Sequence, residues 1–322
     1  MLIDEFSSFE NKYLFEKKYD DFSYWVYSRY AIFSYLTKLQ EGIEMSSQKM
    51  TDGLICGIKN MIINSLRYRH KIKKIGHRDL LILNHERRVL KDGYYRCIYT
   101  EQIEEHYPNS VVLERPYFYK HLKPIQTERI FYSDCVELES LIYGFLECKL
   151  KAKKYRKAKK FFEKEMSIVA PEFQHMVKQE VSVEALSEML TRLYLLYCVK
   201  RKKFEKVIQK IQPKVILEVV SYNLDCMIFN EIAYEKKINT IELQHGVMSG
   251  SIAYYYPKNV LIKQFPQKVF LFSDYWKNCI SVPLEDKNVI SVGYPYFEEQ
   301  VKKYQKINRD KNKTTKVILF LS

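Results

Sequence analysis

The C-terminal half of the sequence alternates short apolar runs with a segment of helical spacing. Apolar runs occupy residues 215–220, 239–243, 269–272 and 289–292, and residues 223–237 have the pattern of a helix. Short apolar runs that end in polar residues are typical of strands buried on both faces. Parallel strands need long connections, usually helices, so strands that alternate with helices indicate a parallel sheet. The pattern therefore predicts a parallel sheet with crossover helices.

Three further apolar runs precede this half of the chain, at residues 79–84, 110–113 and 128–132. The second run is followed by Glu114 and the third by Ser133. Each has the length and composition of a strand. We therefore predict an α/β fold built on a Rossmann-like parallel sheet.

The remaining segments have helical patterns. Residues 10–69 are unusually aromatic, and we predict a helical N-terminal extension over residues 1–76. Ordinary helix packing explains the aromatic residues, and an aromatic surface at a membrane interface is the alternative. Residues 136–166 and 182–211 also have helical spacing, with Ser182 placed to cap the second helix. We expect these helices to be inserted in the Rossmann-like domain at residues 136–211.

The last apolar run, residues 316–322, ends with the sequence itself. A buried strand is an unusual place for a natural terminus, so we expect the chain to be a fragment of a longer protein. Residues 77–301 are predicted to form the Rossmann-like domain. Residues 302–322 are predicted to be a lysine-rich linker and the first strand of a truncated second domain.

Cysteine usage and the N-terminus bear on the cellular compartment. The seven cysteines are scattered and never spaced as CxxC or as metal ligands, which predicts reduced thiols. The acidic N-terminus lacks the basic start and apolar run of a secretory signal. The sequence also has no stretch of about 18 uncharged apolar residues that would span a bilayer. We therefore expect a cytoplasmic protein.

The formal net charge is +14, and the excess is concentrated in residues 65–78, 149–160 and 200–210. Basic clusters favour anionic partners such as phospholipid, polyprenyl phosphate or nucleic acid. Solvated helix faces are the alternative interpretation. A nucleic-acid-binding protein is supported by the charge alone, because the sequence has no recognisable motif for reading a nucleic acid.

Several common catalytic motifs are absent from the sequence. It contains neither GxxxxGK[ST] nor GxGxxG, and no GxSxG. These absences remove P-loop kinases, dinucleotide oxidoreductases and serine hydrolases from the leading explanations. The seven histidines are far apart and none is spaced as HxxxH or HExxH. We therefore predict no metal site and no cofactor.

The strand ends provide the candidate site, because ligands of open parallel sheets bind at the carboxyl ends of the strands. His245 is the strongest candidate for catalysis. It follows the strand at 239–243 and precedes Gly246, where a missing side chain lets a substrate approach. A histidine can take a proton from an attacking hydroxyl near neutral pH. Glu242 has the opposite strand parity to His245, which makes it a weaker choice for a direct partner. A histidine that only caps the strand is the alternative.

A second group of candidates lies at the ends of the other strands. His85 and Glu86 offer an acid/base pair, and Arg87 and Arg88 offer guanidinium groups suited to phosphate or carboxylate. Adjacent residues of an extended chain point to opposite sides, so at most one of each pair faces a given pocket. The full set of predicted acceptor-binding residues is His85, Glu86, Arg87, Arg88, Glu114, Tyr222, Gln244 and Gly246.

Four segments resemble the last part of the N-terminal domain of bacterial GT-B glycosyltransferases, which assemble capsule, lipopolysaccharide and related surface glycans. They are PKVIL at 213–217, NTIELQHG at 239–246, VFLFSDYW at 269–276 and ISVGYPY at 290–296. Residues 79–100 resemble the first strand and following turn of such proteins, so the likeness spans about two-thirds of the chain. In the related polyol-phosphate transferases of teichoic-acid synthesis, the histidine of the HG motif is the general base. The resemblance implies that role for His245.

The resemblance implies transfer of a sugar from a nucleotide-sugar donor to a lipid-linked or glycan acceptor. Arg87 and Arg88 would orient an anionic acceptor, and the basic helices would hold the protein at the inner leaflet of the plasma membrane. Transfer of a polyol phosphate from a CDP-activated donor is one alternative, and a non-catalytic scaffold of a glycan-assembly complex is another. The donor-binding residues are not assigned, because the nucleotide-binding domain would begin near Lys316. We therefore expect little turnover from this chain alone.

Overall fold

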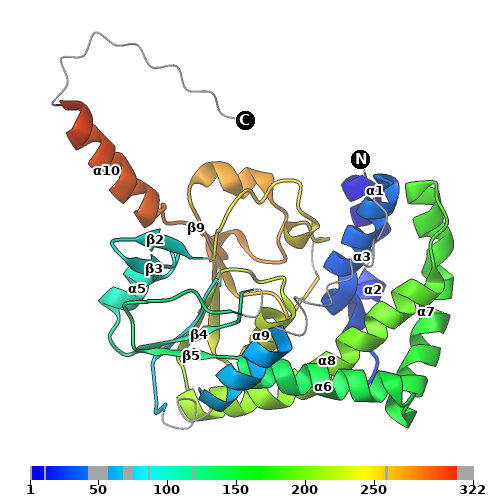
Figure 1. The fold of residues 1–322 in the computed structure, drawn as a ribbon. Helices are drawn as coiled ribbons and strands as arrows, with labels where there is room; N and C mark the ends of the chain where they lie inside the picture. Colours follow the sequence, from blue (N-terminus) through cyan, green and yellow to red (C-terminus); the bar gives the residue numbers. More distant parts are fainter. Residues whose placement is uncertain are drawn as a thin grey trace.

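A sheet of seven parallel strands forms the centre of the molecule (Figure 1). The computed structural model describes residues 2–10, 12–42, 57–67, 75–85, 88–117, 120–257 and 260–309. All six neighbouring strand pairs in the sheet are parallel, which confirms the predicted α/β fold. The strands are β1 (Leu80–Leu83), β4 (Ser110–Glu114), β5 (Ile130–Tyr132), β6 (Val215–Glu218), β7 (Asn239–Leu243), β8 (Lys268–Leu271) and β9 (Val289–Ser291).

The strand order changes direction between β1 and β6, and the carboxyl edge of the sheet at this switch point is called the crevice. Across the sheet the order is β5-β4-β1-β6-β7-β8-β9. Two strands, β4 and β5, therefore lie on one side of β1, and four strands, starting with β6, lie on the other side. This is the strand order of a Rossmann-like sheet, in which ligands bind outside the carboxyl ends of the two central strands. The crevice is thus the expected position for a binding site.

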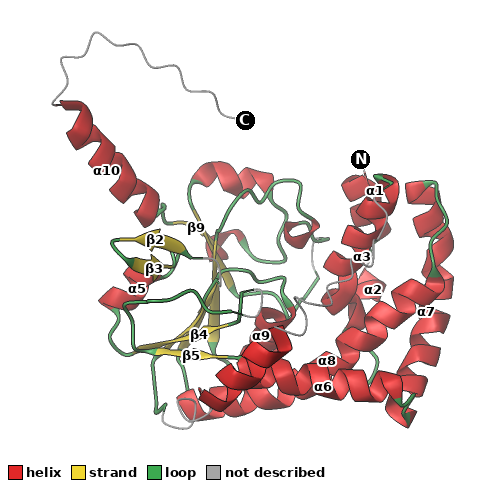
Figure 2. Cartoon of the chain, viewed as in Figure 1, coloured by secondary structure: helices red, strands yellow, loops and turns green. Residues whose placement is uncertain are grey.

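Side chains of the strands contribute to a hydrophobic core on each face of the sheet. Leu81 and Ile82 are both fully buried, and they belong to different cores because successive residues of a strand point to opposite faces. One face is covered by helices α8 (Val183–Ile211) and α9 (Leu224–Lys236), and helix α3 (Tyr24–Gln40) packs against α8. The other face is covered in part by α5 (Glu101–His106), and Figure 2 shows the helices around the strands.

The predicted helix at 136–166 is in fact two helices, α6 (Asp134–Lys149) and α7 (Lys153–Val177). The chain turns between them at Lys151, which has a positive φ of 43°. Apolar spacing continues across this turn, so the pattern did not reveal the break. Ser182 caps α8 as predicted, because its hydroxyl accepts a hydrogen bond of 3.1 Å from the Ala185 amide.

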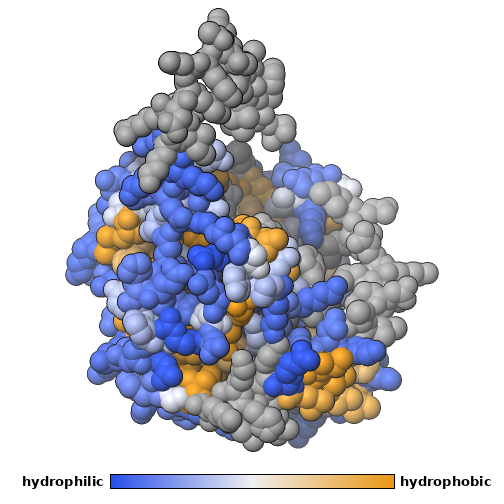
Figure 3. Space-filling model, turned by 60° about the vertical axis from the view of Figure 1, so that its left-hand side comes forward, coloured by the Kyte–Doolittle hydropathy of each residue, from blue (hydrophilic) through white to orange (hydrophobic). Residues whose placement is uncertain are grey.

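The outer face of α6 is apolar. Five large side chains there are between 44% and 72% exposed, namely Leu141, Ile142, Phe145, Leu146 and Leu150. Figure 3 shows apolar patches of this kind on a mainly hydrophilic surface. Within the described ranges, no helix is both long enough and apolar enough to cross a membrane.

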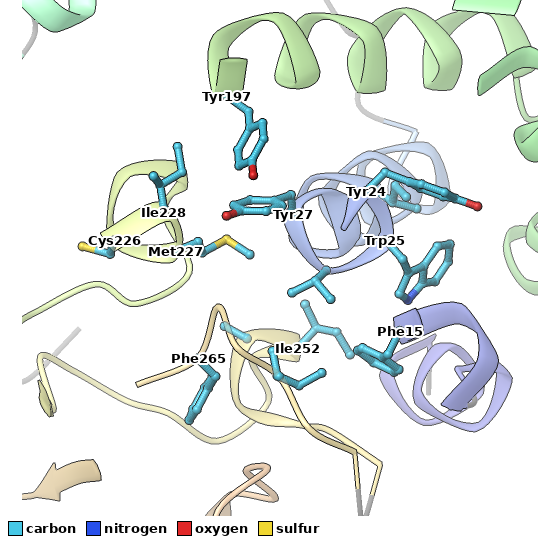
Figure 4. Close-up of a cluster of buried hydrophobic side chains, with 14 of the residues drawn as sticks. Phe15, Tyr24, Trp25, Tyr27, Tyr197, Cys226, Met227, Ile228, Ile252 and Phe265 are labelled. Atoms are coloured by element: carbon cyan, nitrogen blue, oxygen red, sulfur yellow. The ribbon is translucent and has the colours of Figure 1, made fainter. Parts of the chain in front are cut away.

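The aromatic N-terminal segment packs into the core. Its helices are α1 (Leu2–Phe9), α2 (Lys12–Glu16) and α3. Tyr24, Trp25 and Tyr27 of α3 are each at most 5% exposed. Figure 4 shows Tyr27 between Tyr197 of α8 and Met227 of α9. Helix packing therefore explains these three aromatic residues, whereas Tyr13 and Tyr30 of the same segment are 67% and 39% exposed.

Three local features differ from the sequence-based expectations. A hairpin of β2 (Val89–Lys91) and β3 (Tyr94–Arg96) was not predicted, although its Asp-Gly turn is a strong hairpin signal. The resemblance of the VFLFSDYW segment to GT-B enzymes implies a helix after β8, and the structure has only a short 3-10 helix there, η2 (Asp274–Cys279). Residues 302–309 belong to helix α10 (Pro295–Arg309), which projects from the body (Figure 1), so this part of the predicted linker is helical. The predicted strand at 316–322 lies outside the described residues.

Candidate functional site

The crevice between β1 and β6 brings together three of the predicted site residues. His85 follows β1, Tyr222 lies between β6 and α9, and His245 follows β7. The ring centre of His245 is 6.2 Å from that of His85 and 6.0 Å from that of Tyr222. The fold therefore gathers residues that are up to 160 positions apart in the sequence, as their numbers 85 and 245 show.

His245 is half-buried among aromatic side chains. The Tyr222 hydroxyl oxygen lies 3.4 Å from its Nε2 atom. The Tyr99 hydroxyl donates a hydrogen bond of 2.7 Å to the His245 carbonyl oxygen. Tyr99 also stacks on Tyr294, with ring centres 6.0 Å apart and planes 11° apart. The imidazole of His245 therefore lies between the aromatic rings of Tyr99 and Tyr222.

Two of these aromatic residues were missing from the predicted site. Tyr99 lies just after the β2–β3 hairpin, far from any predicted strand end. Tyr294 lies within the ISVGYPY segment that carries the family resemblance, but no role was assigned to it. The stacking of these two rings is a tertiary contact that strand periodicity does not encode.

The surroundings keep the His245 imidazole neutral. Burial lowers the pKa of His245 to about 4, and the nearby His85 contributes to the same shift. The Val219 backbone opposes the shift but does not reverse it. Burial also raises the pKa of Tyr222 to about 12, so its hydroxyl keeps its proton at neutral pH. A neutral imidazole has one ring nitrogen that accepts a proton.

Glu242 is not the direct partner of His245, in agreement with the strand-parity argument. Its carboxylate is fully buried and accepts hydrogen bonds from the Ser221 amide at 3.1 Å and the Tyr254 hydroxyl at 2.8 Å. Glu242 therefore contacts the loop and the short helix that flank the site.

Arg88 and Glu114 bind each other. The Arg88 side chain is only 2% exposed, and its Nη2 atom lies 2.6 Å from a carboxylate oxygen of Glu114. Glu101 lies on the other side of the same guanidinium, and Asn84 donates to Glu114. This buried network stabilises the end of β1, so we do not retain Arg88 and Glu114 as acceptor ligands. Glu86 and Arg87 lie outside the described residues.

Gln244 and Gly246 shape the turn after β7. The buried Gln244 side chain donates to the Gly246 carbonyl oxygen at 2.8 Å and accepts from the Phe272 amide at 2.8 Å. It thereby ties the turn to β8. A Cβ atom added at Gly246 would have no neighbour within 4 Å, so the backbone there is open to an approaching molecule.

Two hollows in the described part of the chain lie away from His245. One of about 980 Å³ is bordered by the middle of α8 and by α9, and one of about 740 Å³ is bordered by residues 277–289. In the larger hollow, Arg201 forms ion pairs with Glu231 and Glu235. We give more weight to the titratable and aromatic groups at the crevice, because open α/β sheets bind ligands there.

Comparisons with family models, with curated proteins and with solved structures found no match for this chain. The fold and the site define its class. It is an α/β protein with a Rossmann-like sheet of seven parallel strands and a histidine-tyrosine cluster at the carboxyl edge.

Proposed function

We propose that the protein is a glycosyltransferase-like enzyme of bacterial surface-polysaccharide synthesis. It would transfer a sugar from a nucleotide-sugar donor to a glycan or lipid-linked acceptor. The main support is the position of His245, a half-buried neutral imidazole at the crevice where Rossmann-like sheets bind ligands. The resemblance of residues 239–246 and 290–296 to GT-B enzymes supports the same function.

In the proposed reaction, Nε2 of His245 accepts the proton of the acceptor hydroxyl. The new bond forms between that hydroxyl oxygen and the anomeric carbon, while the bond from the anomeric carbon to the nucleotide diphosphate breaks. Burial and His85 disfavour the imidazolium that results. The negative charge of the donor or of a phosphate-bearing acceptor would offset this cost. The rings of Tyr99 and Tyr222 offer flat apolar surfaces for a sugar ring.

Two alternative functions use the same residues differently. In the transfer of a polyol phosphate from a CDP-activated donor, the acceptor hydroxyl would attack phosphorus instead of carbon. His245 would accept the proton of that hydroxyl in both reactions. In a non-catalytic scaffold, His245 would only cap the end of β7 by hydrogen bonding. The donor-binding residues stay unassigned in all three cases.

We also propose that an anionic membrane surface is a partner, with the lipid-linked acceptor located there. The apolar face of α6, with Leu141, Phe145 and Leu150 exposed, leads directly into the basic residues at 149–160. Apolar side chains beside lysines suit the boundary between headgroups and acyl chains. Each lysine near an anionic surface contributes about 1 kcal/mol. The basic cluster at 200–210 contributes less, because Lys200 is buried between Glu137 and Asp225.

Donor screening of the full-length protein tests this function. His245→Gln should lower turnover by about 10²–10⁴-fold, the usual contribution of a general base. His106→Gln is the matched control, because His106 is exposed on α5 and its ring contacts the Gln102 carbonyl of the same helix. Activity with nucleotide sugars supports the glycosyltransferase, and activity with CDP-glycerol supports the alternative. Turnover of His245→Gln within a few-fold of wild type would favour the scaffold.

A further inference from the structure

Two glutamates lie side by side at the centre of the sheet, near the strand end that carries His245. Glu218 is the last residue of β6, and the strand register pairs its Cα atom with that of Glu242 in β7. Both residues are 0% exposed. Neighbours in register on adjacent strands project to the same face of a sheet, so the two carboxyl groups are adjacent.

Each carboxyl group receives its hydrogen bonds on one oxygen. Oε1 of Glu218 accepts from Nδ2 of Asn230 at 2.8 Å. Oε1 of Glu242 accepts from the Ser221 amide and the Tyr254 hydroxyl. The Oε2 atoms of both glutamates have no hydrogen-bond partner among the described residues. Two adjacent carboxyl groups that are both fully buried cannot both stay ionised at low cost, and one O–H between the two Oε2 atoms would satisfy both.

We propose that Glu218 and Glu242 share a single proton between their Oε2 atoms, and that this acid pair positions Tyr222 against His245. Glu242 is the carboxylate of the pair, because its Oε1 atom already accepts two hydrogen bonds. Glu218 carries the proton and donates it. The pair then has one negative charge instead of two.

The groups around the pair are neutral. Cys226 and Asn230 face it from α9, Ser221 from the following loop, and Tyr254 from the short helix η1 (Ile252–Tyr254). In the part of the chain that the structure describes, neither carboxyl group forms an ion pair with a lysine or arginine. Burial raises the pKa of Glu218 to about 8, with a further contribution from Glu242, and burial raises that of Glu242 to about 7. A proton retained at neutral pH agrees with the shared arrangement.

The path from the pair to the site is short. Glu242 holds the Ser221 amide, and the next residue is Tyr222. Glu242 also holds the Tyr254 hydroxyl, and the Tyr254 ring packs at 89° to the Tyr222 ring with centres 6.0 Å apart. Tyr222 in turn places its hydroxyl 3.4 Å from His245. Loss of the shared proton would set two negative charges against each other and loosen this support.

Difference infrared spectroscopy with ¹³C-labelled glutamate tests for the shared proton. At pH 7 the wild type should show the carbonyl stretch of one buried carboxylic acid that both Glu218→Gln and Glu242→Gln lack. Ser221→Ala is the control, because its hydroxyl is the other donor near Glu242 and its loss should leave the band in place. A band that persists in both glutamine variants, or a wild type without it, would overturn the proposal.

Stability gives a second test. One amide in the pair replaces the O–H donor, so near pH 5 each single variant should fold as well as wild type. In the double variant, Glu218→Gln with Glu242→Gln, two amide donors face each other without an acceptor. Unfolded glutamates lose their protons near pH 4.3, so the folded wild type binds one extra proton above that pH. Its folding constant should fall about tenfold per pH unit between pH 5 and 7 relative to Glu218→Gln. A double variant more stable than both single variants would contradict a shared proton.

The positioning role has its own readout, the imidazole NMR signal of His245. It should be unchanged in Glu218→Gln at pH 7 but shifted in the double variant, whereas Ser221→Ala should leave it in place. A double variant that loses stability without moving this signal would refute the positioning role. The positioning role rests on the proposed function of His245, but none of these measurements needs transfer activity. Failure here and failure of the proposed function are therefore distinguishable.

Discussion

The basicity of His245 is the property on which the proposed chemistry depends, and it is directly measurable. Its pKa is expected at about 4 instead of the usual 6.5. At pH 7 about one imidazole in a thousand would then carry a charge. A titration of the imidazole signals by NMR, assigned with His245→Gln, should show the His245 signal as that of a neutral ring from pH 8 down to pH 5.

Replacing the neighbouring histidine separates the two causes of the shift. His85→Gln should raise the pKa of His245, because the charge on His85 opposes a second charge nearby. The pKa should stay below 6.5, because burial is the larger cause. His106→Gln, on exposed α5, should leave it unchanged. An inflection of the His245 signal at or above pH 6.5 in the wild type would refute this account of the site.

The same shift predicts how His245 affects stability. Between pH 4 and 6.5 the unfolded chain binds more protons at this residue than the folded protein does, so the contribution is complete above pH 6.5 and is lost as the pH falls toward 4. At about 1.4 kcal/mol per pKa unit the upper limit is about 3.5 kcal/mol. Solvent around the half-buried ring reduces this value. His245→Gln should therefore be less sensitive to acid than wild type over this range.

Two further predictions concern stability and membrane binding. Arg29→Met should lower the free energy of unfolding by about 3–5 kcal/mol, because it leaves the carboxylate of Glu10 buried without its cation. Denaturant titration measures this loss, and the double variant with Glu10→Gln should recover part of it. Phe145→Asp should weaken sedimentation with phosphatidylglycerol vesicles by more than tenfold, since one large apolar side chain contributes about 1.5–3 kcal/mol on burial. Leu90→Asp, at an equally exposed position on the hairpin, should bind like wild type, and equal binding of both variants would rule out the α6 face.

The fold was predictable because burial on both faces leaves a strong signal in the sequence. All seven strands of the sheet coincide with predicted apolar runs, and the Ser182 cap predicted the start of α8. The order of the strands was not predictable in this way, because a run such as 215–220 does not say which strands it will pair with. The turn at Lys151 also left no signal, since the apolar spacing of α6 continues into α7.

The site was predictable only in part. Strand ends identified His85, Tyr222 and His245, because parallel strands present their carboxyl ends at one edge. The same rule also selected Arg88 and Glu114, which the fold uses to neutralise each other. A charged residue at a strand end satisfies the rule equally well whether its partner is a substrate or another side chain. Only tertiary structure distinguishes the two cases.

The distribution of buried charge supports a site at this edge. Glu114, Glu218 and Glu242 are each at most 1% exposed and lie in the carboxyl-terminal halves of three strands. The same strands begin with the small or apolar residues Ser110 and Val215 and with the neutral Asn239. A buried carboxyl group costs free energy that an apolar side chain would avoid. Stability alone does not explain why the buried carboxyl groups are concentrated at the carboxyl edge of the sheet. A functional site that needs fixed loops around His245 does explain it.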